Sequence, residues 1–201
     1  MCTRFYNDRD GEQIAERFEV KPIAFKPTYN AAPTQELSVI LDTTPASLST
    51  ATWGFHGQSL VLNARAESIH EKPMFKDTGR CLVPATGFFE WKSGQPFKIT
   101  CPLSLFAFAG LWRKEIINGK EHVSFVILTS DAKGEMAQYH YRMPFILPKN
   151  VEKEWLQTQH PKALLSHPVL PTNFMPVDKK IGNSKNNSAD LLKPLNQLNF
   201  N

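Results

Sequence analysis

The sequence contains little cysteine, and it lacks any long hydrophobic run. Its three cysteines, Cys2, Cys81 and Cys101, are odd in number and show none of the Cys/Cys or Cys/His spacings that are typical of zinc sites. We therefore expect a reducing compartment, no disulfide framework and no bound metal. No apolar stretch approaches the roughly 20 residues of a membrane helix, and the first ten residues lack the apolar core of a secretory signal. These absences favour a cytoplasmic protein with no membrane partner.

A strong charge imbalance is also absent, because 23 Lys and Arg residues oppose 19 Asp and Glu residues, for a formal net charge of +4. This mild excess permits a phosphate-bearing partner but does not require one. Hydrophobic residues form 41% and charged residues 21% of the chain, which argues against global disorder. The length of 201 residues fits a single domain over residues 1–201, with the Asn-, Lys- and Ser-rich segment from about residue 178 at its periphery.

The hydrophobic pattern predicts more strands than helices. Strand-like runs cover residues 37–41, 48–55, 81–83, 87–91, 97–101, 105–112 and 123–129. Short helices are expected after Asp10, from Asp131 to about Gln138, and over residues 151–159 and 189–192, whereas the Pro-rich residues 21–33 are expected to form extended chain or loop. The regular alternation of strand and helix is missing, so we expect a mostly antiparallel α+β fold rather than a doubly wound one.

Cys2 is the first residue with distinctive chemistry. Removal of the initiator Met1 would leave an α-amine and a thiol on one residue. The amine, with an ordinary pKa of about 7.7–8.0, is partly neutral near physiological pH and can attack an aldehyde. The thiol can then add to the resulting imine, and because this second step is intramolecular it is entropically favoured and closes a five-membered thiazolidine. The alternative is that Cys2 is only a small residue at a frayed chain end.

Two further segments carry polar groups that suit a reactive site. Asn63, Arg65 and Glu67 are spaced two apart, so an extended chain would place them on one face, where Asn63 and Arg65 could hold a phosphate or a reacting terminus. Glu90 lies in the aromatic run 87–91, where burial would raise its pKa and make it a useful acid. The alternatives are a solvated polar loop and an ordinary strand with an outward glutamate.

His140 and Arg142 form the last candidate pair. A histidine can transfer protons near neutral pH, and an arginine can hold a phosphate. A lone histidine can equally be structural. The other five histidines show no metal-binding spacing, so none of them is assigned a role.

Taken together and in this order, these segments resemble the SRAP family, which is named for SOS-response-associated peptidases. The matching segments are Met1-Cys2, Asn30-Ala31-Ala32-Pro33-Thr34, Trp53-Gly54, Asn63-Ala64-Arg65-Ala66-Glu67, Arg80-Cys81-Leu82-Val83-Pro84, Gly87-Phe88-Phe89-Glu90-Trp91 and His140-Tyr141-Arg142-Met143-Pro144. Each segment alone is weakly specific, but the ordered set over residues 2 to about 147 is highly specific. The resemblance is looser over residues 180–191.

The resemblance implies a β-rich pseudo-barrel with peripheral helices. It also implies a DNA-damage-response protein that recognises abasic sites in single-stranded DNA, often at junctions with duplex, and that forms a covalent DNA–protein crosslink. The aldehyde of the ring-opened abasic sugar would be captured by the Cys2 aminothiol as a thiazolidine. The family name adds an expected peptidase activity, and imine chemistry of a lyase type follows from the crosslink. We expect no cofactor, a monomer, and a cytoplasmic protein that joins the nucleoid when bound to DNA.

The resemblance also assigns roles to individual residues. Cys2 would be the nucleophile, Asn63 would orient it and the sugar, Glu90 would be a general acid–base, and His140 would assist proton transfer beside the 3′ phosphate. The predicted DNA contacts are phosphate contacts by Arg65 and Arg142, an extension of this basic path by Arg4 and Arg80, and stacking or wedging on bases by Trp53 and Phe75.

Three features limit these assignments. Phe75 is chosen for its location between two motifs rather than by a motif match, and core packing is the alternative for both Trp53 and Phe75. Thr3 stands where many relatives carry glycine, which could change how the N-terminus lies. Tyr141 stands where an acidic residue is common, which makes the charge near His140 more positive.

Two other functions compete with crosslinking. The first is a thiol peptidase that uses Cys2 to remove Met1 or to hydrolyse other peptides. The second is a non-covalent single-stranded DNA-binding module, whose affinity would fall steeply with salt and would survive Cys2→Ala.

Overall fold

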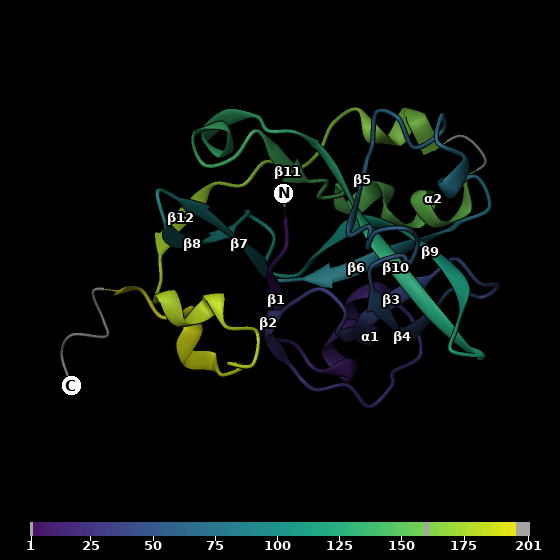
Figure 1. Cartoon of the computed structure of the whole chain (residues 1–201), viewed down its shortest axis with the longest axis horizontal. Helices are drawn as coiled ribbons and strands as arrows, with labels where there is room; N and C mark the ends of the chain where they lie inside the picture. Colours follow the sequence, from purple (N-terminus) through teal and green to yellow (C-terminus); the bar gives the residue numbers. More distant parts are fainter. Residues whose placement is uncertain (1, 159–160, 196–201) are drawn as a thin grey trace.

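The computed structural model describes residues 2–158 and 161–195 and shows two β-sheets with a few short helices at their edges (Figure 1). Nearly all strand pairs are antiparallel, so the predicted α+β class is confirmed. Within the described ranges, no helix has both the length and the apolar character needed to cross a bilayer.

The smaller sheet has five strands in the order β12-β8-β7-β1-β2. These strands are β1 (Phe5–Asn7), β2 (Thr28–Ala31), β7 (Gly87–Lys92), β8 (Gln95–Thr100) and β12 (Asn173–Pro176). The N-terminal strand β1 is therefore internal, with Phe5 opposite both Ala31 of β2 and Phe88 of β7. An internal position gives the start of the chain hydrogen-bonding partners along both edges.

The larger sheet has seven strands: β3 (Glu36–Leu41), β4 (Ser47–Trp53), β5 (Asn63–Arg65), β6 (Gly79–Ala85), β9 (Phe106–Ile117), β10 (Lys120–Asp131) and β11 (Arg142–Pro144). Strand β10 pairs with β9 and with β4, and the path β4-β3-β6-β9 joins those two neighbours. Five strands thus close on themselves, which is the barrel-like arrangement that the family resemblance implied. The short strands β5 and β11 lie along the C-terminal half of β10.

Alternation along these strands divides the apolar side chains between two clusters. On β6, Cys81 and Val83 pack in a cluster with Cys2 and the five-stranded sheet, whereas Leu82 packs in a cluster with the helices. Because successive side chains of a strand point to opposite faces, the five longer strands β3, β4, β6, β9 and β10 each contribute to both clusters. The larger sheet therefore separates the N-terminal residues from helices α1 (Gly11–Phe18) and α2 (Glu152–Gln157).

The helices follow the predictions in part. Helix α1 begins after Asp10, whose carboxylate accepts the backbone N–H groups of Glu12 and Gln13, as expected of a cap. Asp131, predicted to cap a helix, instead ends strand β10, and a 3₁₀ helix η2 (Gly134–Gln138) follows without a side-chain cap. Pairing with β11 extends β10 to this residue, and this pairing outweighs the local capping preference.

The remaining predictions concern short elements. Strand β2 lies inside the Pro-rich stretch expected to form extended chain or loop, and it is a strand because β1 supplies it with a partner. Helix α2 occupies most of the predicted range 151–159, of which residue 159 lies outside the described residues. The other 3₁₀ helices are η1 (Pro73–Phe75), η3 (Lys149–Val151), η4 (Pro161–Leu165), η5 (Lys179–Gly182) and η6 (Ala189–Leu192), and the last of these coincides with the short helix predicted there.

The C-terminal segment is attached to the edge of the smaller sheet (Figure 1, yellow). The Asn30 Nδ2 group on β2 donates to the carbonyl oxygens of Ile181, Asn183 and Asn186 at 3.0–3.1 Å. One buried amide of the Asn30–Thr34 motif therefore fixes a segment about 150 residues away in the sequence.

Candidate functional site at the N-terminus

Cys2 is buried just before strand β1. Its backbone carbonyl accepts a hydrogen bond from Asn63 Nδ2 on β5 at 3.1 Å, and its Sγ donates to the Arg4 carbonyl at 3.7 Å. The Asn63 contact joins two sheets, because β5 belongs to the larger sheet and β1 to the smaller one. The structure thus brings together the first two of the predicted site residues and shows that Cys2 is not at a frayed end.

Glu90 lies on strand β7, next to the same end of β1. The Phe89 N–H donates to the Arg4 carbonyl at 3.0 Å, and this contact aligns Glu90 with the first residues of the chain. Burial raises the pKa of the Glu90 carboxyl above its ordinary value. Burial, and after it the negative charge of Glu90, likewise raise the pKa of the Cys2 thiol. The two groups are therefore close enough to influence each other, and both are held toward their protonated forms.

His140 lies between η2 and β11. The Arg142 backbone N–H donates to His140 Nδ1 at 2.9 Å, so this nitrogen acts as the acceptor and Nε2 carries the proton of the neutral ring. Burial lowers the pKa of His140, which favours that neutral form near pH 7.

The Arg142 side chain links the His140 segment to the Asn63 segment. Its Nη1 donates to Glu67 Oε1 at 2.9 Å and to Asp131 Oδ1 at 2.5 Å, and its Nη2 donates to Glu67 Oε2 at 2.9 Å and to the Thr129 carbonyl at 2.6 Å. Strands β5 and β11 flank the same end of β10, with Arg65 and Pro144 both opposite Thr129. The guanidinium therefore bridges both motifs across the end of that strand.

These contacts correct the prediction for Arg142. Its side chain is only 5% exposed and all four Nη hydrogens are occupied, so it cannot present a bidentate fork to a phosphate in this conformation. In this conformation the guanidinium instead holds the two segments of the candidate site together. The sequence did not predict its partners Glu67 and Asp131. The presence of Glu67 in the same motif as Asn63 was the one feature that could have suggested such a partner.

Two other arginines lie near Cys2. Arg65 is exposed on β5, two residues from Asn63. Arg4 is half-buried, and its guanidinium donates to the Thr3 carbonyl at 2.9 Å and to the Gly182 carbonyl at 3.4 Å.

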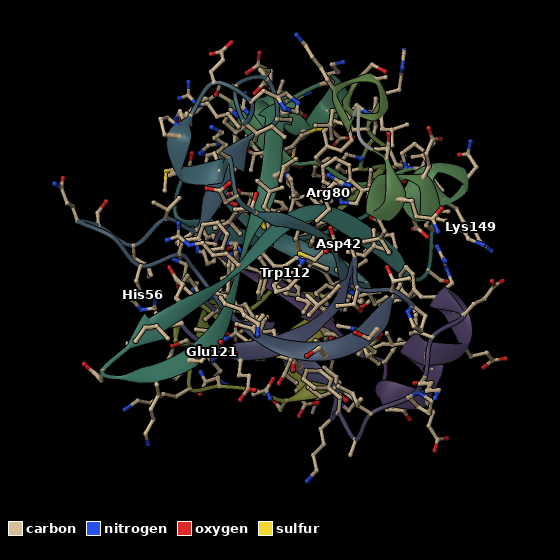
Figure 2. The ribbon with its side chains drawn as sticks, turned by 90° about the vertical axis from the view of Figure 1, so that its right-hand side faces the viewer. Asp42, His56, Arg80, Trp112, Glu121 and Lys149 are labelled. Carbon is tan, nitrogen blue, oxygen red and sulfur yellow. The ribbon has the colours of Figure 1, made fainter. Side chains whose placement is uncertain are left out.

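Arg80 does not belong to this group, which corrects the predicted basic path. On β6 it points with Leu82 to the helix-facing side of the larger sheet, where its Nε donates to the Trp155 carbonyl at 2.6 Å. It lines a pocket of about 750 Å³ between α1, α2 and the β3–β4 turn. Figure 2 faces this side and labels Arg80 and Asp42. The sheet separates this pocket from Cys2.

The two aromatic residues predicted to contact bases lie in the core. Trp53 is fully buried, its Nε1 donates to the Leu62 carbonyl at 3.0 Å, and its ring contacts Phe5 with centroids 5.2 Å apart. Phe75 is buried against Phe55, at a centroid distance of 6.4 Å. Neither ring has a face available to a base in this conformation, which favours the core-packing alternative over the predicted base contacts.

The part of the chain that the structure describes contains no group of three or more His, Cys, Asp or Glu side chains arranged to hold a metal ion. The candidate site comprises Cys2 with Asn63 and Glu90 beside it, and His140 in the segment that the Arg142 guanidinium links to that of Asn63. These are a potential nucleophile, an amide donor, a carboxyl whose pKa is raised by burial and an imidazole whose pKa is lowered by burial, and together they suit proton transfer around a carbonyl carbon.

Comparison with known proteins identifies the family of the chain. The family model described as SOS response associated peptidase (SRAP) matches residues 1–184. The chain belongs to the SRAP family. The SRAP match includes every residue of the candidate site.

Three SRAP relatives are each named an abasic site processing protein. YoaM of Bacillus subtilis is 32% identical, over 98% of this chain and 100% of its own length. YedK of Escherichia coli is 27% identical over 97% of this chain and 100% of its own length, and HMCES of Rattus norvegicus is 26% identical over 96% of this chain and 72% of its own length.

Solved structures show the same SRAP fold. A protein from Bacteroides thetaiotaomicron matches with a TM-score of 0.79 at 22% identity, covering 96% of this chain and 99% of its own. A phage-related protein from Bordetella bronchiseptica matches with a TM-score of 0.74 at 26% identity, covering 88% of this chain and 94% of its own.

Proposed function

We propose that this protein binds abasic sites in single-stranded DNA, alone or at junctions with duplex, and crosslinks to them through Cys2 once Met1 has been removed. The observation that carries the proposal is the placement of Cys2, held at its carbonyl by Asn63 and lying beside the buried carboxyl of Glu90. The names of YoaM, YedK and HMCES as abasic site processing proteins support the choice of substrate.

The chemistry needs only the two groups of Cys2 and the aldehyde of the ring-opened sugar. The α-amine attacks the aldehyde carbon C1′ and forms a carbinolamine, which loses its hydroxyl as water and becomes a protonated imine. The Cys2 sulfur then adds to the imine carbon, the thiol proton leaves, and a neutral thiazolidine results. The net change is the loss of one water, and the second bond forms within one residue at high effective concentration.

Glu90 can serve both proton transfers. Because burial raises its pKa, the carboxyl is protonated at higher pH than an ordinary glutamate and can give its proton to the departing hydroxyl. The resulting carboxylate can then take the thiol proton as sulfur adds. This sequence suits the raised pKa of the Cys2 thiol, which needs a nearby base to react as a nucleophile.

Asn63 and His140 complete the proposed roles. The Asn63 Oδ1 atom is buried and accepts no hydrogen bond within the described residues, so it can accept one from the freed amine or from a sugar hydroxyl. His140 can donate from Nε2 to the sugar or to its 3′ phosphate. Arg65 and Arg4 provide cations for the flanking backbone phosphates.

The experiment is a denaturing gel with intact-mass analysis. The protein, verified by mass to lack Met1, is incubated with a single-stranded oligonucleotide that carries one abasic site. We expect a heat-stable adduct whose mass equals protein plus oligonucleotide minus one water. Cys2→Ala should abolish it, whereas the matched variant Cys101→Ala, which removes another buried thiol, should retain it.

The outcomes separate the competing functions. An oligonucleotide whose aldehyde has been reduced to an alcohol should give no adduct. Absence of an adduct from the processed wild type would contradict the proposal. Salt-sensitive binding that persists in Cys2→Ala would then indicate a non-covalent module, and Cys2-dependent hydrolysis of peptides would indicate a peptidase.

A further inference from the structure

Tyr141 presents an aromatic face to solvent beside the candidate site. Its residue surface is 67% exposed, and it is the one aromatic residue among the exposed large apolar residues of the described chain. Its ring stacks on His140, with centroids 4.4 Å apart and planes inclined by 25°. An exposed aromatic ring offers a large, rigid and partly apolar surface on which a planar ligand can stack.

The backbone that carries Tyr141 is fixed on both sides. The Tyr141 carbonyl accepts the Ala132 N–H at 3.0 Å, and the N–H of the next residue, Arg142, is bound to His140 Nδ1. The Arg142 side chain is held in turn by Glu67 and Asp131. One face of the ring rests on the imidazole, so the other face is held ready with little conformational entropy left to lose.

From this geometry we propose that Tyr141 forms a binding subsite for the nucleobase that neighbours the abasic sugar. This inference rests on the proposed function for its ligand class, which is single-stranded DNA. Every base has a π-face, so stacking on an aromatic ring tolerates any sequence and favours the larger purines. The base, Tyr141 and His140 would form a continuous stack that ends at the imidazole of the reacting centre.

The subsite is connected to the reacting groups through the Arg142 guanidinium, which joins its segment to that of Asn63, the residue that contacts Cys2. An abasic nucleotide has no base of its own to bind, so affinity and register must come from its phosphates and its neighbours. A rigid ring next to the site supplies a contact to a neighbour that an acidic side chain at position 141 could not supply.

The test measures non-covalent binding, so it does not depend on crosslinking. Fluorescence anisotropy gives the Kd of two single-stranded oligonucleotides that carry tetrahydrofuran, an abasic analogue without an aldehyde. One has a single tetrahydrofuran flanked by adenines, and the other has tetrahydrofuran at the central and both neighbouring positions. We expect the wild type to bind the first at least roughly fivefold more tightly.

Three variants decide whether Tyr141 causes that difference. Tyr141→Phe should keep the ratio of the two Kd values, and Tyr141→Ala should bring it close to one. Ile116→Ala, which removes another exposed apolar side chain on the β9–β10 hairpin, should leave it unchanged. A wild-type ratio of one, binding of neither oligonucleotide, or an unchanged ratio in Tyr141→Ala would overturn the inference.

A second readout separates stacking from an effect through His140. If Tyr141 only tuned the imidazole, Tyr141→Ala would shift the pH profile of crosslinking and would weaken binding of both oligonucleotides equally. Crosslinking of the wild type on an aldehyde-bearing oligonucleotide is measured in parallel. Failure of that reaction alone would contradict the proposed function and leave the Kd ratio to decide on the subsite.

Discussion

Replacing Arg142 with methionine removes the cation that joins the Asn63 and His140 segments. Its bond to the buried Thr129 carbonyl should contribute about 1.5 kcal/mol, as hydrogen bonds to charged groups do. Glu67 is 48% and Asp131 82% exposed, so water replaces much of what they lose, and their ion pairs should add only about 1 kcal/mol together. We therefore expect Arg142→Met to lower the free energy of unfolding by about 2–3 kcal/mol, or Tm by roughly 5–10 °C.

Urea unfolding near neutral pH measures this difference, with calorimetry as the second method. Asp131→Asn is the matched control, because its carboxylate contacts the same guanidinium but is mostly in water, and it should cost less than about 1 kcal/mol. Arg142→Met should also slow crosslinking beyond its effect on stability, since His140 and Tyr141 lose their support. Equal free energies of unfolding for the two variants, or a wild-type value for Arg142→Met, would contradict this role of the guanidinium.

Three further changes test other parts of the site. Asn63→Ala should slow crosslinking roughly tenfold and should also lower the free energy of unfolding by about 1 kcal/mol, because the Cys2 carbonyl loses its donor, and an unchanged rate would contradict this role. Burial raises the pKa of Glu90 in the folded state, so ionisation of this carboxyl opposes folding once the pH rises above the pKa that it has in the unfolded chain. Urea unfolding should therefore show that Glu90→Gln is more stable than the wild type at about pH 8, and that the difference is smaller at about pH 5. An equal difference at both values would exclude that cause. Trp53→Phe should cost about 1–3 kcal/mol in unfolding and leave the Kd for single-stranded DNA unchanged, and weaker binding without loss of stability would revive its role at the bases.

The longer strands were predictable because their signal is local. The run from Val123 to Thr129 reads as a strand from its own side chains, and β10 contains it. The three-residue strands β5 and β11 carry no such signal, because they exist only through pairing with β10. Asp131 gives the opposite case of a local signal that fails, because a residue suited to cap a helix instead ends strand β10, where it pairs with β11.

The candidate site divides in the same way. The chemistry of Cys2, Asn63, Glu90 and His140 follows from residue type and motif order, and the structure brings Asn63 and Glu90 to Cys2. Whether an arginine side chain is free to bind a ligand does not follow from the sequence, because the guanidinium of Arg142 is held by Glu67, a residue 75 positions away in the chain.

The aromatic residues could not be ranked from sequence for the same reason. Trp53 and Tyr141 both carry large rings and both lie in family motifs. Only tertiary packing makes Trp53 a core residue and Tyr141 a surface residue.

The internal position of β1 has a mechanical consequence. A chain end is usually the part of a protein that yields first, but here the strand that follows Cys2 is flanked by antiparallel neighbours on both edges. Tension on a DNA strand attached at Cys2 would run along β1 and load the hydrogen bonds to β2 and β7 together, in shear, rather than one after another. A protein that holds DNA by its first residue would thus transmit the pull of a polymerase or helicase into the middle of a sheet.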